Sequence, residues 1–430
     1  MTYAEAVARI LALRGGERAG MRPGRERIEA MLDAIGHPEQ AFTIAQVGGT
    51  NGKGSISAML AAALQAAGRH VGLYTSPHLS HYRERIRVDG RPISEADFVD
   101  GVDALGTLIT RLDLTVFEAG TALALDHFCR ARVDVAILEV GLGGRLDATT
   151  VGEPRVVVIG PIDHDHQHEL GDTLTLIAGE KAAIIRSGVA VSARQDPEAE
   201  TVVTRRAALV GVPLLLEGRD LHVTPLGFTW EAQRLDLQGP DWRFSDVACG
   251  LLGVYQPGNA LLAAAAAREL GADEPAIRAG LRGARWPGRF QILRRDPLVI
   301  LDGAHNPAGA RALAASLRAY FPGRPVTFVI GVMADKDAGG ILAALRPLAA
   351  RVIFTASANP RAAAPDALRA LLPASARAGT APSPQAALAM AIAEDPLGIV
   401  CVAGSLSLIG DVLAAAGDGQ DVLFTAGARC

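Results

Sequence analysis

A glycine-rich stretch between an apolar run and a helical pattern constrains the fold more than any other feature of this sequence. Residues 46–55 have the sequence Gln-Val-Gly-Gly-Thr-Asn-Gly-Lys-Gly-Ser, after the apolar run 42–47 and before the helical pattern 56–67. An apolar run of that length is typical of a buried strand. The glycines allow a tight turn whose N–H groups point at one anion, and the helix N-terminus adds the positive end of its dipole. This order predicts a strand–loop–helix phosphate site.

Two residues of this loop have the chemistry that a nucleotide site needs. Lys53 would bring its charge to the β- and γ-phosphates, and Ser55 its hydroxyl to Mg²⁺. The spacing departs from the common P-loop, because Gly54 separates these two residues and Val47 stands where the first glycine is expected. The alternative is a glycine-rich turn that binds nothing. So many glycines cost backbone entropy unless something must approach closely, which favours the phosphate site.

Composition narrows the class of protein. The 430 residues suggest two or three domains, and 49% hydrophobic with 20% charged residues suits a folded chain with full cores. A formal net charge of −4 does not favour a nucleic-acid or membrane-surface binder. The four cysteines are scattered, and no signal segment or apolar run of membrane-spanning length is present. We therefore expect a cytoplasmic protein without a nucleic-acid or membrane partner.

Alternating strands and helices predict a doubly wound α/β sheet for residues 1–285. The expected strands beyond the first are 71–75, 133–140, 155–159 and 189–192, and the expected helices include 96–112, 121–130 and 173–185. Short alternating segments at 214–247 suggest a small antiparallel β insert. The pattern restarts after the turn-rich segment 286–290, which predicts a smaller Rossmann-like α/β domain over 286–430.

Polar residues stand at the ends of three expected strands of the first domain: Ser76, Glu139 and His166. Ligands of open α/β sheets gather outside the carboxyl ends of the strands. A carboxylate inside a buried strand is costly unless it is paired or bound to metal, so Glu139 is either in an ion pair with an arginine or near a cation. The three side chains together favour Mg²⁺. The histidines of 163–168, two of which would share one side of a strand, leave a transition metal as the less favoured alternative.

Other polar residues have two interpretations each. By pattern alone, Lys181 is an ordinary helix lysine. Asp302 follows a strand of the second domain, where it would meet a ribose hydroxyl or cap the next helix, a role that Asn306 would also fill. Asn259 stands at the opening of an alanine-rich helix, where capping is the simplest role.

Motifs over almost the whole chain resemble, in order, those of the Mur ligase superfamily, in the branch of folylpolyglutamate synthases that are often also dihydrofolate synthases. The motifs are Gly49 to Ser55, Tyr74 to Leu79, Arg83 to Val88, Phe117-Glu118, Leu138 to Thr149, Asp165-His166, Leu170-Gly171, Glu180 to Ala182, Gln256 to Ala260, Pro287 to Phe290, Asp302 to Pro307, Asp335 to Asp337 and Gly404-Ser405.

The resemblance implies an ATP-dependent ligase that joins L-glutamate to a folate carboxylate, and also to dihydropteroate, through an acyl phosphate. It implies a monomer with a P-loop domain, a C-terminal glutamate-ligase domain, and one or two Mg²⁺ ions. The alternatives are another Mur-type amino-acid ligase, such as one that makes cell-wall precursors, and a nucleotide-dependent switch without ligase activity. The form Lys53-Gly54-Ser55 argues against the first, and the motifs of the second domain argue against the second.

The resemblance also implies roles for individual residues. ATP would be held by Thr50, Asn51, Gly52, Lys53, Gly54, Ser55, Asn259, Arg289 and Asp302. Mg²⁺ would be held by Ser76, Glu139 and His166. The catalytic set would be Lys53, a Lys181 carboxylated by CO₂ as a further metal ligand, and His305 near the phosphates. The pterin side of the folate would be lined by Thr115, Val116, Phe117, Glu118, Leu146, Asp147 and Ala148.

Two arginine-containing segments remain. Where bifunctional members have Asp-Leu-Gly-Leu before the first Glu-Arg, this chain has Arg22-Pro23-Gly24-Arg25. That loop is expected to contact dihydropteroate, so the second reaction stays open. Arg83, Arg85 and Arg87 alternate, and we expect a solvated strand face, with attraction of polyglutamate carboxylates as the alternative.

Overall fold

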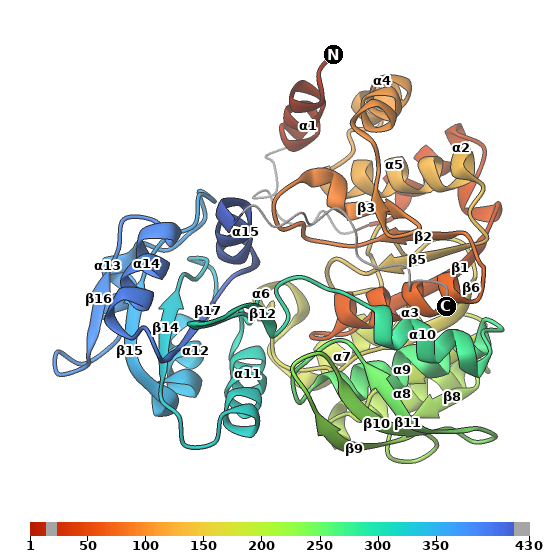
Figure 1. The fold of residues 1–430 in the computed structure, drawn as a ribbon. Helices are drawn as coiled ribbons and strands as arrows, with labels where there is room; N and C mark the ends of the chain where they lie inside the picture. Colours follow the sequence, from red (N-terminus) through yellow and green to blue (C-terminus); the bar gives the residue numbers. More distant parts are fainter. Residues whose placement is uncertain (14–23, 417–430) are drawn as a thin grey trace. The chain divides into compact units, whose positions relative to one another are not determined.

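The computed structural model describes residues 1–13 and 24–416, which form two compact units (Figure 1). Of the described residues, the first contains those within 1–250 and 257–285, and the second contains 251–256 and 286–416. Each unit has its own sheet and its own hydrophobic core. The expected α/β architecture with parallel sheets is confirmed.

The main sheet of the first unit has eight strands in the order β4-β3-β2-β5-β1-β6-β7-β8, and β3 alone runs against the others, since it pairs antiparallel with both β2 and β4. The strands are β1 Thr43–Gly48, β2 Val71–Tyr74, β3 Ile86–Val88, β4 Arg91–Pro92, β5 Val135–Glu139, β6 Pro154–Ile159, β7 Val189–Ser192 and β8 Leu214–Leu216. The central strands are buried over nearly their whole length, as strands covered on both faces must be.

Helices cover this sheet on both faces (Figure 1). The helices are α1 Tyr3–Leu11, α2 Glu26–Ala34, α3 Lys53–Ala66, α4 Glu95–Arg111, α5 Val116–Ala131, α6 Gln167–Leu170, α7 Leu174–Ala182, α8 Pro197–Leu209, α9 Gln256–Glu269 and α10 Glu274–Gly283. One core joins α1, α2, α4 and α5 to the sheet, and a second joins α7 and α8 to it. Helix α10 packs closely on α3, since a Cβ added to Gly280 would lie 2.3 Å from the Ala63 backbone.

A separate three-stranded antiparallel sheet follows β8, in the order β11-β10-β9. Its strands are β9 His222–Phe228, β10 Gln233–Gln238 and β11 Arg243–Cys249. The antiparallel sheet therefore begins later than the expected residue 214, because Leu214–Leu216 pairs in parallel with β7 and closes the main sheet.

The second unit has a six-stranded sheet in the order β12-β13-β17-β14-β15-β16, with only β12 antiparallel. The strands are β12 Gln291–Arg295, β13 Leu298–Leu301, β14 Val326–Ile330, β15 Ala349–Phe354, β16 Ala378–Thr380 and β17 Ile399–Ala403. The helices are α11 Pro307–Tyr320, α12 Ala338–Leu345, α13 Pro365–Arg369, α14 Pro384–Glu394 and α15 Leu406–Ala416.

The prediction of a solvated arginine face was wrong for two of the three arginines. Arg85 and Arg87 are buried, at 4% and 3% exposure. The Nε of Arg85 donates to His78 Nδ1, and Arg87 donates to the carbonyls of Glu84 and Gly90. Residues 82–85 form a 3₁₀ turn and not a strand, so the side chains do not alternate as expected.

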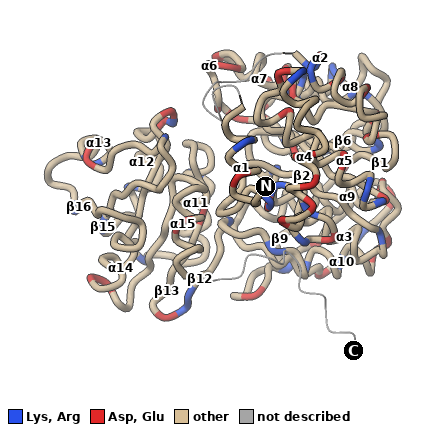
Figure 2. The backbone as a smooth tube through the Cα atoms, turned by 90° about the horizontal axis from the view of Figure 1, so that it is seen from above, with Lys and Arg blue, Asp and Glu red and all other residues tan. Residues whose placement is uncertain are grey.

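The distribution of charged residues and the hydropathy of the helices agree with what the composition predicts. Positive and negative residues are interspersed along the backbone (Figure 2). No helix within residues 1–13 and 24–416 is both long enough and apolar enough to cross a membrane.

Candidate functional site

The carboxyl ends of four neighbouring parallel strands bring the candidate residues of the first unit to one edge of the main sheet. Strand β1 is central: Val47 pairs with Glu139 of β5, and Gly48 pairs with Ile159 of β6. On the far side of β5, Tyr74 of β2 pairs with Leu138. The segments that follow these strands, which are far apart in the sequence, therefore begin beside one another.

The glycine-rich loop after β1 has the backbone conformation that its sequence predicts. Gly49 has φ +124°, and a Cβ there would lie 2.9 Å from the Gly160 backbone. Gly52 has φ +83° and precedes α3. Positive φ at both positions, together with the close approach at the first, explains why glycine is required.

Some N–H groups of this loop donate to a carbonyl of another loop, and others belong to the first turn of α3. Thr50 and Asn51 donate their N–H groups to the Pro161 carbonyl, and the Thr50 hydroxyl donates to the Asp163 carbonyl. The first intrahelical bond of α3 runs from Ile56 N to Gly52 O. An anion would therefore be met by the first turn of α3, whose N–H groups take no part in the helix ladder.

Two lysine ammonium groups converge on one carbonyl oxygen of this loop. Lys53 Nζ lies 3.1 Å from Gly49 O, and Lys181 Nζ on α7 lies 3.2 Å from the same oxygen. Lys181 is 4% exposed, and burial, with Lys53 as the second cause, lowers its pKa to about 7. Lys181 is therefore not the solvated helix lysine that its pattern alone suggests. A large fraction of its amine is neutral at neutral pH.

The three residues expected to hold Mg²⁺ lie at or after the ends of β2, β5 and β6, three of the four strands at this edge. Glu139 is 4% exposed, and its Oε2 accepts the Ser76 N–H at 3.1 Å. His166 follows β6 in a left-handed conformation, and its ring lies 3.9 Å from carboxylate oxygens of Asp165 and Glu169. The contact between Ser76 and Glu139 places a hydroxyl residue beside a buried carboxylate, a combination of oxygen ligands that suits Mg²⁺.

The transition-metal alternative for 163–168 finds no support. Those residues do not form a strand, because the chain passes through the left-handed His166 directly into α6. His164 and His166 therefore do not share one side of a strand. Within the part of the chain that the structure describes, no three His, Cys, Asp or Glu side chains gather as metal ligands.

The start of α5 carries four of the residues expected to line the folate pocket, and is called here its first expected wall. Thr115 caps this helix, and its hydroxyl and N–H both donate to Glu118 Oε2, at 2.9 and 2.8 Å. The half-buried ring of Phe117 lies against Gly141, where a Cβ would be 2.6 Å from the ring. Val116 is buried in the core of this helix face.

The loop after β5 carries the other three and is the second expected wall. Asp147 is buried, and its carboxylate accepts the N–H groups of Gly141, Leu142 and Thr149 and the Thr149 hydroxyl. Burial raises the pKa of this carboxyl, against the lowering effect of these donors. Leu146 is half-buried and Ala148 is buried. Asp147 thus holds the shape of the loop.

Asn259 lies beside the phosphate loop. A Cβ added to Gly52 would be 2.5 Å from Asn259 Oδ1. The expectation that Asn259 caps its helix was wrong, since α9 begins three residues earlier, at Gln256.

In the second unit, Asp302 follows β13 and is buried at 3% exposure. Its Oδ2 accepts the Tyr255 hydroxyl at 2.7 Å and the Phe290 N–H at 2.9 Å, and its Oδ1 accepts the Ala304 N–H at 2.9 Å. Burial raises the pKa of this carboxyl, while its donors and the Arg289 charge lower it. Arg289 also donates to the Gly288 carbonyl at 3.1 Å.

His305 and Asn306 complete this strand end. His305 Nδ1 lies 2.8 Å from the Gly303 carbonyl, an acceptor, so Nδ1 carries a proton in this contact. Asn306 is the cap of α11, because its Oδ1 accepts the Gly309 N–H at 2.7 Å. The capping alternative for Asp302 is therefore wrong.

Three contacts between distant residues were missed from the sequence. Arg27 pairs with Glu118, Arg25 donates to the Thr150 carbonyl, and Tyr255 donates to Asp302. A local signal exists only for Glu118, whose spacing from Thr115 is that of a capping box. The partners lie 91, 125 and 47 residues apart, so no local pattern joins them.

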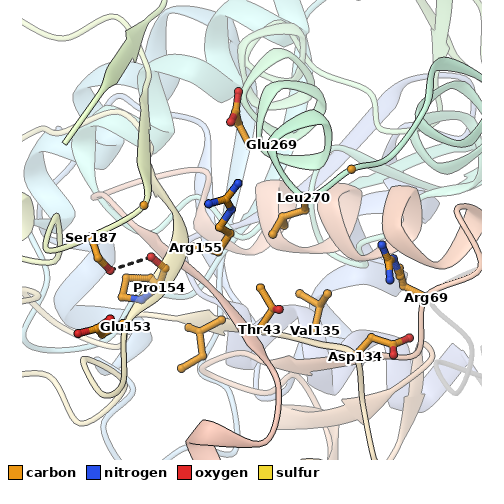
Figure 3. A pocket seen from close by; sticks show the side chains of 13 residues that line it. Thr43, Arg69, Asp134, Val135, Glu153, Pro154, Arg155, Ser187, Glu269 and Leu270 are labelled. Carbon is orange, nitrogen blue, oxygen red and sulfur yellow. Dashed lines mark hydrogen bonds between the residues drawn. The ribbon is translucent and has the colours of Figure 1, made fainter.

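A cavity of about 590 Å³ lies at the opposite edge of the main sheet (Figure 3). It is lined by the amino ends of β1, β5 and β6, with Arg69, Arg155, Asp134, Glu153 and Glu269 among its residues. Its charges are of both signs, and no residue predicted for the site lines it. The cavity therefore lies apart from the candidate site.

Two family models match the chain. The Mur ligase middle domain matches residues 47–267, and the glutamate ligase domain of Mur ligases matches residues 288–406.

Curated relatives cover much of the chain. A dihydrofolate synthase/folylpolyglutamate synthase of Mycobacterium tuberculosis is 38% identical over 375 residues, 80% of this chain and 77% of the relative. A probable bifunctional folylpolyglutamate synthase/dihydropteroate synthase of Halobacterium salinarum is 40% identical over 428 residues, 96% of this chain. The chain spans 51% of the length of that second relative.

Solved structures match the fold over nearly its full length. The folylpolyglutamate synthase of Mycobacterium tuberculosis, complexed with ADP and AMPPCP, has a TM-score of 0.90 at 35% identity, covering 96% of this chain and 99% of that one. A folylpolyglutamate synthase–AMPPCP–folate complex has a TM-score of 0.85 at 34% identity, covering 97% and 100%.

Proposed function

The chain belongs to the Mur ligase family, in its branch of folylpolyglutamate and dihydrofolate synthases, and we propose that it uses ATP to join L-glutamate to a folate carboxylate. The observation that carries this proposal is the pair of lysines around Gly49 in the phosphate loop, in a chain that resembles ATP-analogue complexes of such synthases over nearly its full length.

The chemistry requires an activated carboxylate. A carboxylate is a poor electrophile, so the folate carboxylate attacks the γ-phosphorus of ATP, ADP leaves, and an acyl phosphate forms. The amine of L-glutamate then attacks the acyl carbon, and phosphate leaves with the bond electrons. Negative charge on the transferred phosphoryl oxygens is stabilised by Lys53 and by the N–H groups of the first turn of α3.

Glu139, Ser76 and His166 are the residues that would hold Mg²⁺. The fit rests on the buried Glu139 carboxylate, which the Ser76 N–H orients. One carboxylate and one hydroxyl leave positions for phosphate oxygens and water, which Mg²⁺ prefers to keep. When bound, the ion would neutralise charge on the phosphates.

Lys181 is proposed to react with CO₂. Its neutral amine attacks the carbon of CO₂ and loses a proton, which gives an anionic carbamate beside the Lys53 ammonium. The lowered pKa and the buried position both favour this reaction. The chain has only three lysines, Lys53, Lys181 and Lys336, so ¹³C NMR in labelled bicarbonate would identify the modified one. The carbamate signal should vanish in Lys181→Met and persist in Lys53→Met. A signal unchanged in Lys181→Met would overturn the assignment.

The remaining assignments follow from the family. We assign residues 1–285 to the ATP-binding domain and 286–430 to the glutamate-ligase domain. Thr50 to Ser55 and Asn259 would contact ATP from the first, and Arg289, Asp302 and His305 from the second. Thr115 to Glu118 and Leu146 to Ala148 would line the folate pocket. We propose that the enzyme acts as a cytoplasmic monomer.

Dihydropteroate is proposed as a second acceptor, since the relative from Mycobacterium tuberculosis is named for both reactions. The segment that departs from bifunctional members begins at Arg22 and Pro23, which lie outside the described residues. Its last residue, Arg25, is described, and it donates to the Thr150 carbonyl at 2.7 Å.

The test is ADP release by the purified protein with Mg²⁺-ATP and L-glutamate. Tetrahydrofolate and dihydropteroate are offered in separate reactions, with glutamate left out as the control. We expect glutamate-dependent turnover with both. Turnover with tetrahydrofolate alone would exclude the second reaction. Turnover with neither would overturn the folate assignment and favour another Mur-type ligase, for which amino-acid conjugates of cell-wall precursors are the substrates to try next.

A further inference from the structure

Two arginines at the start of α2 bind the two segments that the proposed function assigns to folate. Arg27 Nη2 lies 2.8 Å from Glu118 Oε1, and its Nε donates to Glu118 Oε2 at 3.2 Å, a two-point contact with the start of α5. Arg25 Nη1 donates to the Thr150 carbonyl at 2.7 Å, in the loop after β5. One helix start therefore contacts both walls of the expected pocket.

The contacts of Glu118 leave little of its carboxylate for a ligand. Oε2 accepts the N–H and hydroxyl of Thr115 as well as Arg27 Nε, and Oε1 accepts Arg27 Nη2. Both oxygens therefore already have donors within the protein. On this geometry Glu118 holds other groups in place, and the half-buried Phe117 and Leu146 are the wall residues open to contact with folate.

The two arginine contacts differ in strength. The side chains of Arg27 and Glu118 are 17% and 6% exposed, so removal of either leaves the other charge buried without its partner, which is strongly unfavourable. Arg25 is 32% exposed, and its ion pair is with Glu29, which is 51% exposed. Pairs this exposed contribute little. Arg27 is therefore the main link and Arg25 the weaker one.

We propose that Arg27 is a positioning residue for the folate side of the site. It acts through Glu118 to fix the start of α5, while Arg25 ties the same helix start to the loop after β5, so that the two walls keep their spacing before folate binds. This inference rests on the proposed function. Because these contacts join the start of α2 to the start of α5 and to the loop after β5, the effect should fall on folate and not on ATP.

The test measures ADP release at saturating ATP and glutamate while tetrahydrofolate is varied, and then with ATP varied. The variants are Arg27→Met, Arg27→Lys, Glu118→Gln and Arg25→Leu. Arg130→Met is the matched control, because Arg130 forms an exposed pair with Asp126 on the same helix α5. We expect Arg27→Met and Glu118→Gln to raise the folate KM by roughly tenfold or more, with kcat and the ATP KM changed by less than about threefold.

The conservative variants separate positioning from folding. Arg27→Lys should raise the folate KM by less than Arg27→Met does, since lysine keeps the charge but not the two-point geometry. Arg25→Leu should raise the folate KM by only about twofold, and Arg130→Met should change nothing. Thermal unfolding of each variant identifies any that fails to fold, and Arg27→Lys and Arg25→Leu keep the question answerable if Arg27→Met does not fold.

The outcomes distinguish this inference from the proposed function. Wild-type protein without folate-dependent turnover overturns both. Active wild-type protein with an unchanged folate KM in Arg27→Lys and Glu118→Gln overturns the positioning role alone. A fall in kcat together with similar rises in the folate KM and the ATP KM also overturns it, because the pair would then only stabilise the fold.

Discussion

The phosphate loop and the proposed folate walls are built in different ways, although both lie at the same edge of one sheet. The phosphate loop is continuous: one strand, one turn and one helix start supply its glycines, its N–H groups and Lys53. The proposed folate walls come from two separate segments, the start of α5 and the loop after β5, which the start of α2 joins through Arg27 and Arg25. The phosphate loop can be recognised in the sequence, whereas the walls depend on contacts between segments that lie far apart in the sequence.

This difference predicts where activity is most sensitive. The phosphate loop carries the charge that chemistry needs, so a change there should affect turnover with every acceptor. The walls determine the shape of the pocket, so a change there should affect the affinity for one substrate. Four variants test this contrast.

Lys53→Met should give the largest effect. Removal of one group that stabilises transition-state charge costs on the order of 100- to 1,000-fold in kcat. The loss should be the same with tetrahydrofolate and dihydropteroate, because Lys53 acts on phosphate. Steady-state ADP release measures it, with thermal unfolding as the control for folding. A fall in kcat with only one of the two acceptors would contradict this contrast between the phosphate loop and the walls.

Lys181→Met should change the pH dependence of stability. In the folded protein burial lowers the pKa of Lys181 to about 7, whereas the unfolded chain keeps the ordinary value of 10.5. Between these values the unfolded state binds more protons, so wild-type stability gains from Lys181 as pH rises. The variant lacks this gain, so its stability relative to wild type should be highest near pH 6 and fall by a few kcal/mol toward pH 10.

Urea unfolding in CO₂-free buffer measures that difference. CO₂ must be excluded because a carbamate would add its own pH dependence. A stability difference that is constant from pH 6 to pH 10 would show that Lys181 does not lose its proton on folding. The two lysines at Gly49 would then both stay charged, and the carbamate proposal would lose its chemical basis.

The sequence predicted the continuous parts of this molecule well. The order of strands and helices and the strand–turn–helix around Lys53 follow from local patterns of apolar residues and glycines. The start of α5 was placed five residues too late, although the Thr115–Glu118 spacing is itself a helix-start signal. The burial of Lys181 was not predictable, because a single lysine in a helix has the same local pattern whether it faces water or a neighbouring loop.

The discontinuous parts were predicted only through resemblance. The pattern of Arg83, Arg85 and Arg87 suggested a solvated face, but Arg85 and Arg87 are buried and donate to His78 and to nearby carbonyls. Likewise, nothing local joins Arg27 to Glu118 or Tyr255 to Asp302. The partners of Arg27 and Tyr255 lie far along the chain, whereas Arg85 and Arg87 meet nearby residues through a 3₁₀ turn that the alternating pattern did not predict.

Gly49→Ala tests the loop as a backbone structure. Its φ of +124° is unfavourable for alanine, and the new Cβ would lie 2.9 Å from the Gly160 backbone. We expect a loss of at least about 2 kcal/mol in unfolding free energy, with a weaker ATP affinity. Gly179→Ala is the control, because that helical position has open space and should gain up to about 1 kcal/mol. Equal effects at the two positions would contradict the argument from the loop's conformation.

The smallest effect compares two identical caps. Thr115 and Thr2 each begin a helix, and each accepts the N–H of a glutamate three residues on, at 3.3 Å in both cases. Thr115→Val and Thr2→Val should therefore each cost about 1 kcal/mol of stability. Only Thr115 also donates its hydroxyl to the carboxylate that Arg27 holds. Thr115→Val should accordingly raise the folate KM by severalfold while Thr2→Val leaves it unchanged. If both variants lose stability equally and neither alters the folate KM, the start of α5 is an ordinary helix end, and the walls do not depend on the contacts that join them.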